Sequence, residues 1–135
     1  MPLNNSQRLR AFAVTALVFT VLDLLWLGVM ARGFYAGQLG PLLRVDTDWA
    51  AAAMFYLIYL FGIQYFVVWR EAGSSWHHAC LSGALFGLVA YAACDITNLA
   101  MISGFPVQLV LVDLPWGIVL TAVAGMAGHK ALGIR

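Results

Sequence analysis

The chain has 135 residues, of which 63% are hydrophobic and only 10% are charged, and its formal net charge is +1. A water-soluble domain of this size has too small an interior to bury so much apolar surface, so the composition indicates a membrane protein. The nearly neutral charge excludes the strongly basic surface typical of nucleic acid-binding proteins, and we expect no nucleic acid partner.

The first expected transmembrane helix covers residues 10–31. Arg8 and Arg10 precede it, as in a signal peptide. The apolar run is nevertheless longer than the roughly 7–15 residues of a signal core, and it contains Asp23, so we expect a retained span. The segment that follows is expected to be a loop, because it holds four residues that break helices: Gly33, Gly37, Gly40 and Pro41.

Three further apolar runs are long enough to cross a bilayer, which takes about 20 residues in a helix. They cover residues 49–69, 79–102 and 107–131. Short segments at residues 73–75 and 103–106, rich in Gly, Ser and Pro, separate them. The predicted fold class is all-α: a four-transmembrane-helix antiparallel bundle that forms a single integral membrane domain over residues 1–135.

The positive side chains predict how this bundle lies in the membrane. Five of them fall on the side shared by both termini and the second loop, whereas only Arg32 and Arg44 fall on the other side. Cytoplasmic loops are enriched in lysine and arginine, so we expect both termini to be cytoplasmic. Tryptophans and histidines near the helix ends are interpreted as interfacial or solvated side chains. The five cations are Arg8, Arg10, Arg70, Lys130 and Arg135, and the interfacial residues are Trp49, Trp69, Trp76, His77, His78 and His129.

Three aspartates lie inside the apolar runs, at matching depth. Asp23 comes eight residues before the end of the first run, Asp95 seven before the end of the third, and Asp113 six after the start of the fourth. Each is therefore about 9–12 Å from the same membrane boundary. A carboxylate in hydrocarbon is costly and is tolerated mainly where it faces a bundle interior or a wet cavity. We expect the three to share a layer in the outer half of the bilayer.

Aromatic and polar residues extend this layer. Tyr56 lies at the same depth on the second helix, and other members share a helix face with one of the aspartates at spacings of three or four residues. We predict a ligand-binding pocket formed by Asp23, Trp26, Tyr56, Tyr91, Asp95, Asn98, Asp113 and Trp116. No spacing of His and Cys typical of a metal site occurs, so neither a metal nor a cofactor is expected.

Small residues on the last two helices predict close helix packing. Gly83 and Gly87 form a GxxxG pair, and a stripe of small residues includes Gly125 and Gly128. The two cysteines, Cys80 and Cys94, fall on one expected helix about 21 Å apart, too far for a disulfide. We interpret both as small apolar side chains.

The chain resembles an uncharacterised bacterial membrane family, domain of unknown function 2177. The resemblance covers nearly the whole chain and rests on residues 23–28, on Phe55-Tyr56 with Gly62, on residues 83–88, on residues 90–100 and on residues 113–117. An aromatic residue often stands in the family where this chain has Cys94. The resemblance implies a small multi-pass protein of the bacterial inner membrane and supplies no established activity.

Several functions are compatible with these residues. The acidic and aromatic layer favours binding or transport of a cationic or amphipathic small ligand. A lipid-modifying acid/base enzyme of isomerase or hydratase type is a second hypothesis, and a membrane-complex subunit or assembly factor is a third. The expected partners are the lipid bilayer, a small cationic or lipid ligand, and another copy of the chain in a homo-oligomer. Taken singly, each aspartate is equally well explained as a hydrogen-bonding link between helices.

Overall fold

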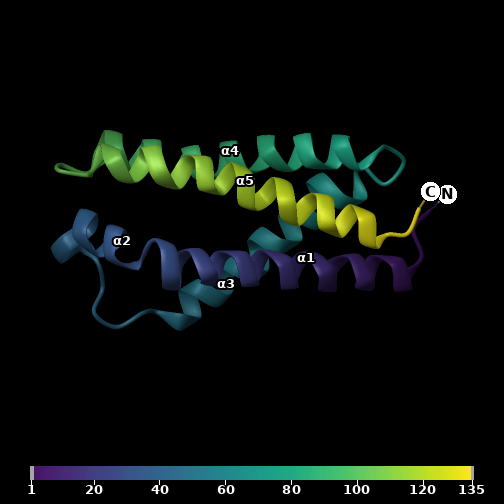
Figure 1. The fold of residues 1–135 in the computed structure, drawn as a ribbon, viewed down its shortest axis with the longest axis horizontal. Helices are drawn as coiled ribbons and strands as arrows, with labels where there is room; N and C mark the ends of the chain where they lie inside the picture. The colour runs from purple at the N-terminus through teal and green to yellow at the C-terminus, as the bar shows by residue number, and fades with distance from the viewer. Residues whose placement is uncertain (1, 135) are drawn as a thin grey trace.

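The computed structural model describes residues 2–134, and this part of the chain is helical without β-strands. Four helices are long and apolar enough to cross a membrane: Asn5–Val29, Trp49–Trp69, Trp76–Met101 and Val107–Ala131. They run alternately in opposite directions along one axis (Figure 1), which confirms the predicted four-helix bundle. Both termini lie at one end of the bundle, here called the termini end. Which membrane face this end occupies remains a prediction, and Arg135 lies outside the described residues.

The first helix, α1 (Asn5–Leu25), begins earlier than the hydropathy of the sequence predicts. Asn4 caps it: its side chain accepts from the Gln7 backbone at 2.8 Å, and the Gln7 side chain accepts from the Asn4 backbone at 3.1 Å. This capping box satisfies two backbone donors that would otherwise be unpaired, so the helix extends beyond the apolar run. The last turn of the span is a π-helix, η1 (Trp26–Met30).

The segment predicted to be a loop contains a helix, α2 (Arg32–Leu39), followed by the short 3₁₀ turn η2 (Gly40–Leu42). The helix ends where Gly40 adopts a positive φ of 49°, a conformation that residues with a side chain rarely take. Figure 1 places α2 opposite the termini end, at what we call the α2 end. There it packs against the last helix of the chain.

The second span is α3 (Trp49–Ile63), which continues as a π-helix, η3 (Gln64–Trp69). The Asp48 carboxylate caps α3 by accepting from the Ala51 backbone at 3.0 Å. In Figure 1 the span crosses behind α1 at an angle. As a result η3 packs against the other three spans, whereas α3 itself has few neighbours.

The last two helices, α4 (Trp76–Met101) and α5 (Val107–Ala131), pack closely along their length. A Cβ atom at Gly83 would lie 2.7 Å from the Thr121 carbonyl oxygen, and one at Gly87 would collide with the Gly117 carbonyl. These contacts confirm that the GxxxG pair is a packing surface. The helix α4 begins at Trp76, three residues before the expected start, and Pro115 lies within α5 without ending it.

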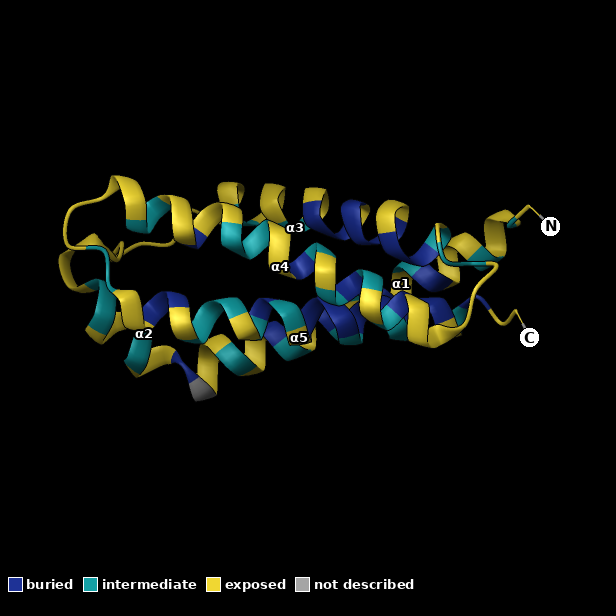
Figure 2. Cartoon of the chain, turned by 90° about the horizontal axis from the view of Figure 1, so that it is seen from above, coloured by how far each residue is buried: buried dark blue, intermediate teal, exposed yellow. Residues whose placement is uncertain are grey.

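The core is concentrated toward the termini end. Figure 2 shows dark blue, buried residues more continuously there, and more exposed and intermediate residues toward α2. Phe19, Ile63 and Leu120 are fully buried. His129 was expected to be solvated, but it is only 7% exposed, because α5 carries it in among the other helices. His77 and His78 are exposed, as expected, and both cysteines are free thiols.

Candidate functional site

A cavity of about 320 Å³ lies between the four spans, in the half of the bundle near the α2 end. Its volume is within the range of small-molecule sites. Seven of the eight residues predicted from the sequence line it. The full lining is Asp23, Trp26, Leu27, Ala52, Phe55, Tyr56, Tyr59, Ala90, Tyr91, Cys94, Asp95, Asp113 and Trp116.

Asp23 is held by hydrogen bonds from two other helices. The Tyr56 hydroxyl on α3 donates to its Oδ2 atom, and the Trp116 indole on α5 donates to its Oδ1 atom at 3.4 Å. The side chain is only 7% exposed. Tyr56 and Trp116, which the sequence predicts to lie in one site with Asp23, therefore contact it directly. These hydrogen bonds also link α1 to α3 and α5.

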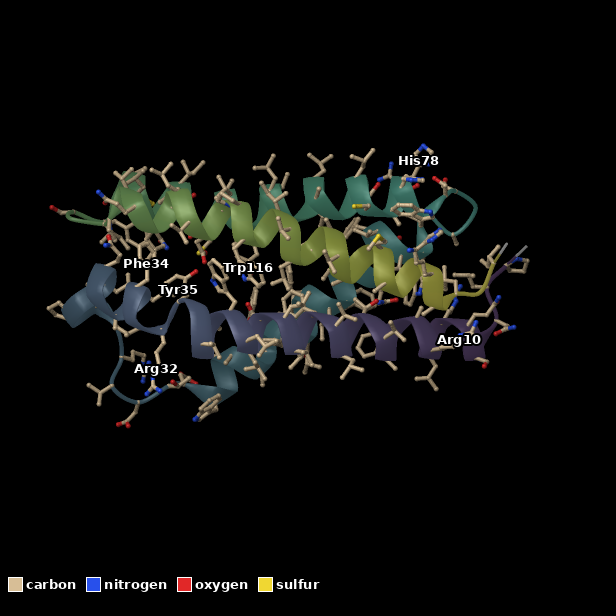
Figure 3. All side chains as sticks on the ribbon, viewed as in Figure 1. Arg10, Arg32, Phe34, Tyr35, His78 and Trp116 are labelled. Carbon is tan, nitrogen blue, oxygen red and sulfur yellow. The ribbon has the colours of Figure 1, made fainter. Side chains whose placement is uncertain are left out.

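Asp113 is held by a residue that the sequence did not predict to be in the site. The Tyr35 hydroxyl donates to Asp113 Oδ1 and accepts a hydrogen bond from the Trp26 indole at 3.1 Å. Figure 3 shows Tyr35 and Trp116 in the region between α1 and α5. Burial, reinforced by the hydrogen bond to Asp113, raises the pKa of the Tyr35 phenol, so that it remains a donor at neutral pH.

Two tryptophans on different helices form part of the wall. The rings of Trp26 and Trp116 stack with their centroids 4.4 Å apart and their planes 7° from parallel. Trp26 opens the π-helical turn η1, a geometry that occurs often at functional sites. The stacked pair links the chain of donors around Asp113 to the donors around Asp23.

Asp95 is the most deeply buried of the three acids, at 3% exposure. Its carboxyl group contacts that of Asp113 on the neighbouring helix. Within residues 2–134, no hydrogen-bond donor reaches its Oδ2 atom. No lysine, arginine or histidine is among the described residues of the lining. Two carboxylates in contact repel strongly, so this pair needs a shared proton or a cation from outside.

Tyrosines form the deeper part of the wall. Tyr59, one turn after Tyr56, shares a hydrogen bond of 2.7 Å with Thr121. The ring of Tyr91 lies directly against Gly117, where any Cβ atom would collide with it. Tyr59 and Phe55 were missed in the sequence, although their spacing from Tyr56 places aromatic rings on adjoining faces of one helix.

Asn98 is the one predicted residue that the structure leaves out of the lining. It lies almost one turn beyond Asp95 on α4, and its amide donates to Cys94 Sγ at 3.7 Å. Its position reflects the limited width of the helix face that turns inward. Cys94, expected to be a small packing residue, instead forms part of the cavity wall.

The three aspartates do not form one cluster, although they line one cavity. Asp95 and Asp113 make a pair, while Asp23 has its own donors. Across residues 2–134, no three His, Cys, Asp or Glu side chains lie close enough to hold a metal ion. The arrangement is therefore an acidic pair beside a separately hydrogen-bonded acid, surrounded by aromatic rings.

Comparison with known proteins gives one match. No curated protein and no solved structure is significantly similar to this chain. The sequence model of one family, described as "Predicted membrane protein (DUF2177)", matches residues 8–130. This match covers nearly all of the chain and agrees with its four candidate spans. The chain therefore belongs to the DUF2177 family of predicted membrane proteins.

Proposed function

We propose that the cavity binds a small amphipathic organic cation. The observation that carries this proposal is the composition of the wall: three aspartates with no cationic side chain among its described residues. The acceptor atom of Asp95 that lacks a donor gives the ligand a specific point of attachment. A buried acidic group without a partner is costly in an apolar region, and a bound cation would compensate it.

The aromatic rings around the acids suit the apolar part of such a ligand. Trp26, Tyr56 and Trp116 surround Asp23, and Tyr59 and Tyr91 form the deeper wall. An ammonium group over an aromatic face gains about 0.5–2 kcal/mol, more where water is excluded. An organic cation therefore fits this wall better than a strongly hydrated metal ion, which needs several oxygen ligands.

Binding is expected to displace a proton. In the absence of a ligand, a proton shared by Asp95 and Asp113 compensates the repulsion between their carboxyl groups. An incoming cation takes over that role, and one proton leaves for each cation bound. Across a membrane, the same exchange would constitute proton-coupled transport.

A matched pair of ligands tests the proposal. Benzyltrimethylammonium and its neutral isostere neopentylbenzene have the same shape, and tryptophan fluorescence of the protein in detergent reports their binding. The cation is expected to bind and the neutral compound to bind at least tenfold more weakly. Equal affinity for the two would overturn the proposal.

Two Asp→Asn variants locate the binding. Asp95→Asn is expected to weaken cation binding at least tenfold, a loss of about 1.4 kcal/mol, because it removes the charge at the unpaired acceptor. Asp46→Asn makes the same change in the exposed loop before α3 and is expected to leave affinity unchanged. If both variants bind like the native protein, the site is elsewhere.

A second function rests on the contact between Asp95 and Asp113. Paired carboxyl groups of this kind can donate and accept a proton on an apolar substrate, as a lipid isomerase or hydratase requires. Incubation with unsaturated lipids in D₂O distinguishes this function: an enzyme would place deuterium on lipid carbon. Deuterium incorporation that Asp113→Asn abolishes would support it, and the absence of incorporation by the native protein would exclude it for those lipids.

A further inference from the structure

We propose that buried polar side chains in the other half of the bundle carry protons between the aspartate cavity and the termini end. We call these residues, Tyr59, Thr121, Gln64, Thr15 and His129, the polar file. This inference rests on the proposed function, because it supplies the route for the proton that a bound cation displaces.

The file begins at the cavity wall. Tyr59 lines the cavity and shares its hydrogen bond with Thr121 on α5. Thr121 is completely buried, so the hydroxyl pair leads from the cavity into the packed half of the bundle. Either hydroxyl can act as the donor, and a proton relay needs this reversibility.

The buried amide of Gln64 gives the strongest support for the polar file. Its side chain is completely buried, and neither its amide nitrogen nor its amide oxygen has a hydrogen-bond partner within residues 2–134. Leaving a buried donor or acceptor unpaired costs about 1–3 kcal/mol, so such a group in a native protein indicates bound water or an ion. The amide both donates and accepts, and water matches both roles.

The neighbours of Gln64 show which way it faces. Val68 follows it by four residues, close to one turn of the π-helix η3, and therefore lies on nearly the same side of that helix. A Cβ atom at Gly125 would lie 2.8 Å from Val67 Cγ1, and one at Gly128 would lie 3.0 Å from Val68 Cγ2. Gln64 is therefore on the face of η3 that packs against α5, between the level of Thr121 and the level of Gly128.

The file continues to the termini end through α1 and α5. Gly128 leaves space for Thr15 of α1, whose hydroxyl bonds to the Ala11 carbonyl at 2.9 Å and retains lone pairs that can accept. The next residue of α5 is His129. Its Nε2 atom bonds to the Glu71 carbonyl at 2.9 Å, and its Nδ1 atom is buried without a partner in the described chain.

The spacing suits a chain of water molecules. Thr121 and His129 are eight residues apart on α5, or about 12 Å along the axis, with Gln64 between them in level. One or two waters between successive groups would complete the path. A proton would leave the aspartate pair, shift along hydroxyls and water, and exit by way of His129, with no net change in the groups between.

The charged groups around the exit come from three elements. Arg8 and Arg10 lie on α1, Glu71 follows η3, and Lys130 lies on α5. The imidazole of His129 has two ring nitrogens, one of which can donate while the other accepts, so it can pass a proton on at this end of the file. Ile63, Leu120 and other fully buried apolar side chains fill the rest of this half.

Proton flux into vesicles tests the inference. The purified protein is reconstituted with a trapped pH-sensitive dye, and a potassium gradient with valinomycin sets the membrane potential. The native protein is expected to acidify the lumen faster than protein-free vesicles do. Gln64→Leu is expected to slow this flux at least tenfold, because leucine removes both polar atoms at nearly the same volume.

Matched variants give the control. Gln108→Leu makes the same substitution at an exposed position of α5 and is expected to conduct like the native protein. Thr15→Val removes one hydroxyl of the file at constant shape and is expected to slow flux also. Native flux in both Gln64→Leu and Thr15→Val, or no native flux above protein-free vesicles, would overturn the inference.

Cation binding separates this inference from the proposed function. Gln64→Leu lies outside the cavity lining and is expected to bind benzyltrimethylammonium in detergent with native affinity, which also shows that it folds. Cation binding by the native protein without proton flux would overturn the proposed role of the polar file and leave the cavity proposal intact. Proton flux that depends on Gln64 without any cation binding would support the polar file and overturn the cavity proposal.

Discussion

The two halves of the bundle are built from the same four helices but pack differently. Toward the termini end, glycines such as Gly125 and Gly128 let α5 approach the other helices closely, and fully buried aliphatic side chains fill the interior. Toward the α2 end, α3 has few neighbours, and aromatic rings with three aspartates surround a cavity. Side-chain size along the helices thus decides where the bundle closes and where it stays open.

The two halves also differ in how their buried polar side chains are hydrogen-bonded. In the cavity, Tyr35, Tyr56 and Trp116 donate from other helices to one oxygen of Asp113 and to both oxygens of Asp23. In the closed half, Gln64 and His129 retain polar atoms without partners in the described chain. Tight packing alone therefore does not satisfy the polar groups of the closed half.

The largest effect is expected from filling a glycine contact in the closed packing of α4 and α5. Gly87→Val would drive its Cβ into the backbone at Gly117, so the two helices would have to separate. We expect loss of the folded state at temperatures at which the native protein is stable, measured by thermal unfolding in detergent. Gly37→Ala, on α2 with open space around it, is the control and should stabilise by about 0.5–1 kcal/mol. A stable Gly87→Val protein would show that the helices are not in contact there.

A smaller effect is expected at the open end from Tyr35→Phe. The change removes the donor to Asp113 and the acceptor for Trp26, leaving both polar groups without that partner. We expect a loss of about 1–3 kcal/mol in unfolding free energy and faster hydrogen exchange in α2. Tyr65→Phe, at a 56% exposed position, should have no effect of this size. Equal stability of the two variants would mean that α2 is not anchored through Tyr35.

The contribution of the Tyr35–Asp113 hydrogen bond to stability should also depend on pH. The folded protein raises the pKa of Tyr35 above its ordinary value of 10.0, so only the unfolded chain loses that proton just above pH 10. The stabilising contribution is therefore complete below pH 10 and declines as pH rises toward the folded-state pKa. The stability difference between native protein and Tyr35→Phe should shrink above pH 10. A difference that grows instead would reverse the assigned direction of the shift.

The smallest effect is expected at Asn98. Sequence periodicity placed it in the site, but the structure places it beyond the lining, bonded to Cys94. Asn98→Ala should change cation affinity less than twofold in the fluorescence titration. A tenfold loss would return Asn98 to the site and imply that α4 rotates when the ligand binds.

Much of the fold follows from local properties of the sequence. Hydropathy and helix rise locate the four spans and place Asp23, Asp95 and Asp113 at one level, because both depend only on position along a helix. Small residues at regular spacing likewise predicted the close contact of α4 and α5. These features do not require knowledge of which helices are neighbours.

Other features depend on tertiary contacts and were missed. The glycines around Tyr35 obscured the short helix α2, which is stabilised by packing against α5. The sequence could not show that Asp95 would pair with Asp113 while Asp23 stayed separate, since that depends on which helices adjoin. The burial of Gln64 and His129 was missed for the same reason.

Proton release on cation binding tests the central claim most directly. Benzyltrimethylammonium is added to the protein in weakly buffered detergent solution, and the change in pH is converted to protons released per bound cation. We predict that the native protein releases about one proton per bound cation. For Asp95→Asn we predict a total proton release at least tenfold smaller than that of the native protein at the same cation concentration. Binding that releases no proton from the native protein, or undiminished release from Asp95→Asn, would contradict the assignment of the paired carboxyl groups as the site.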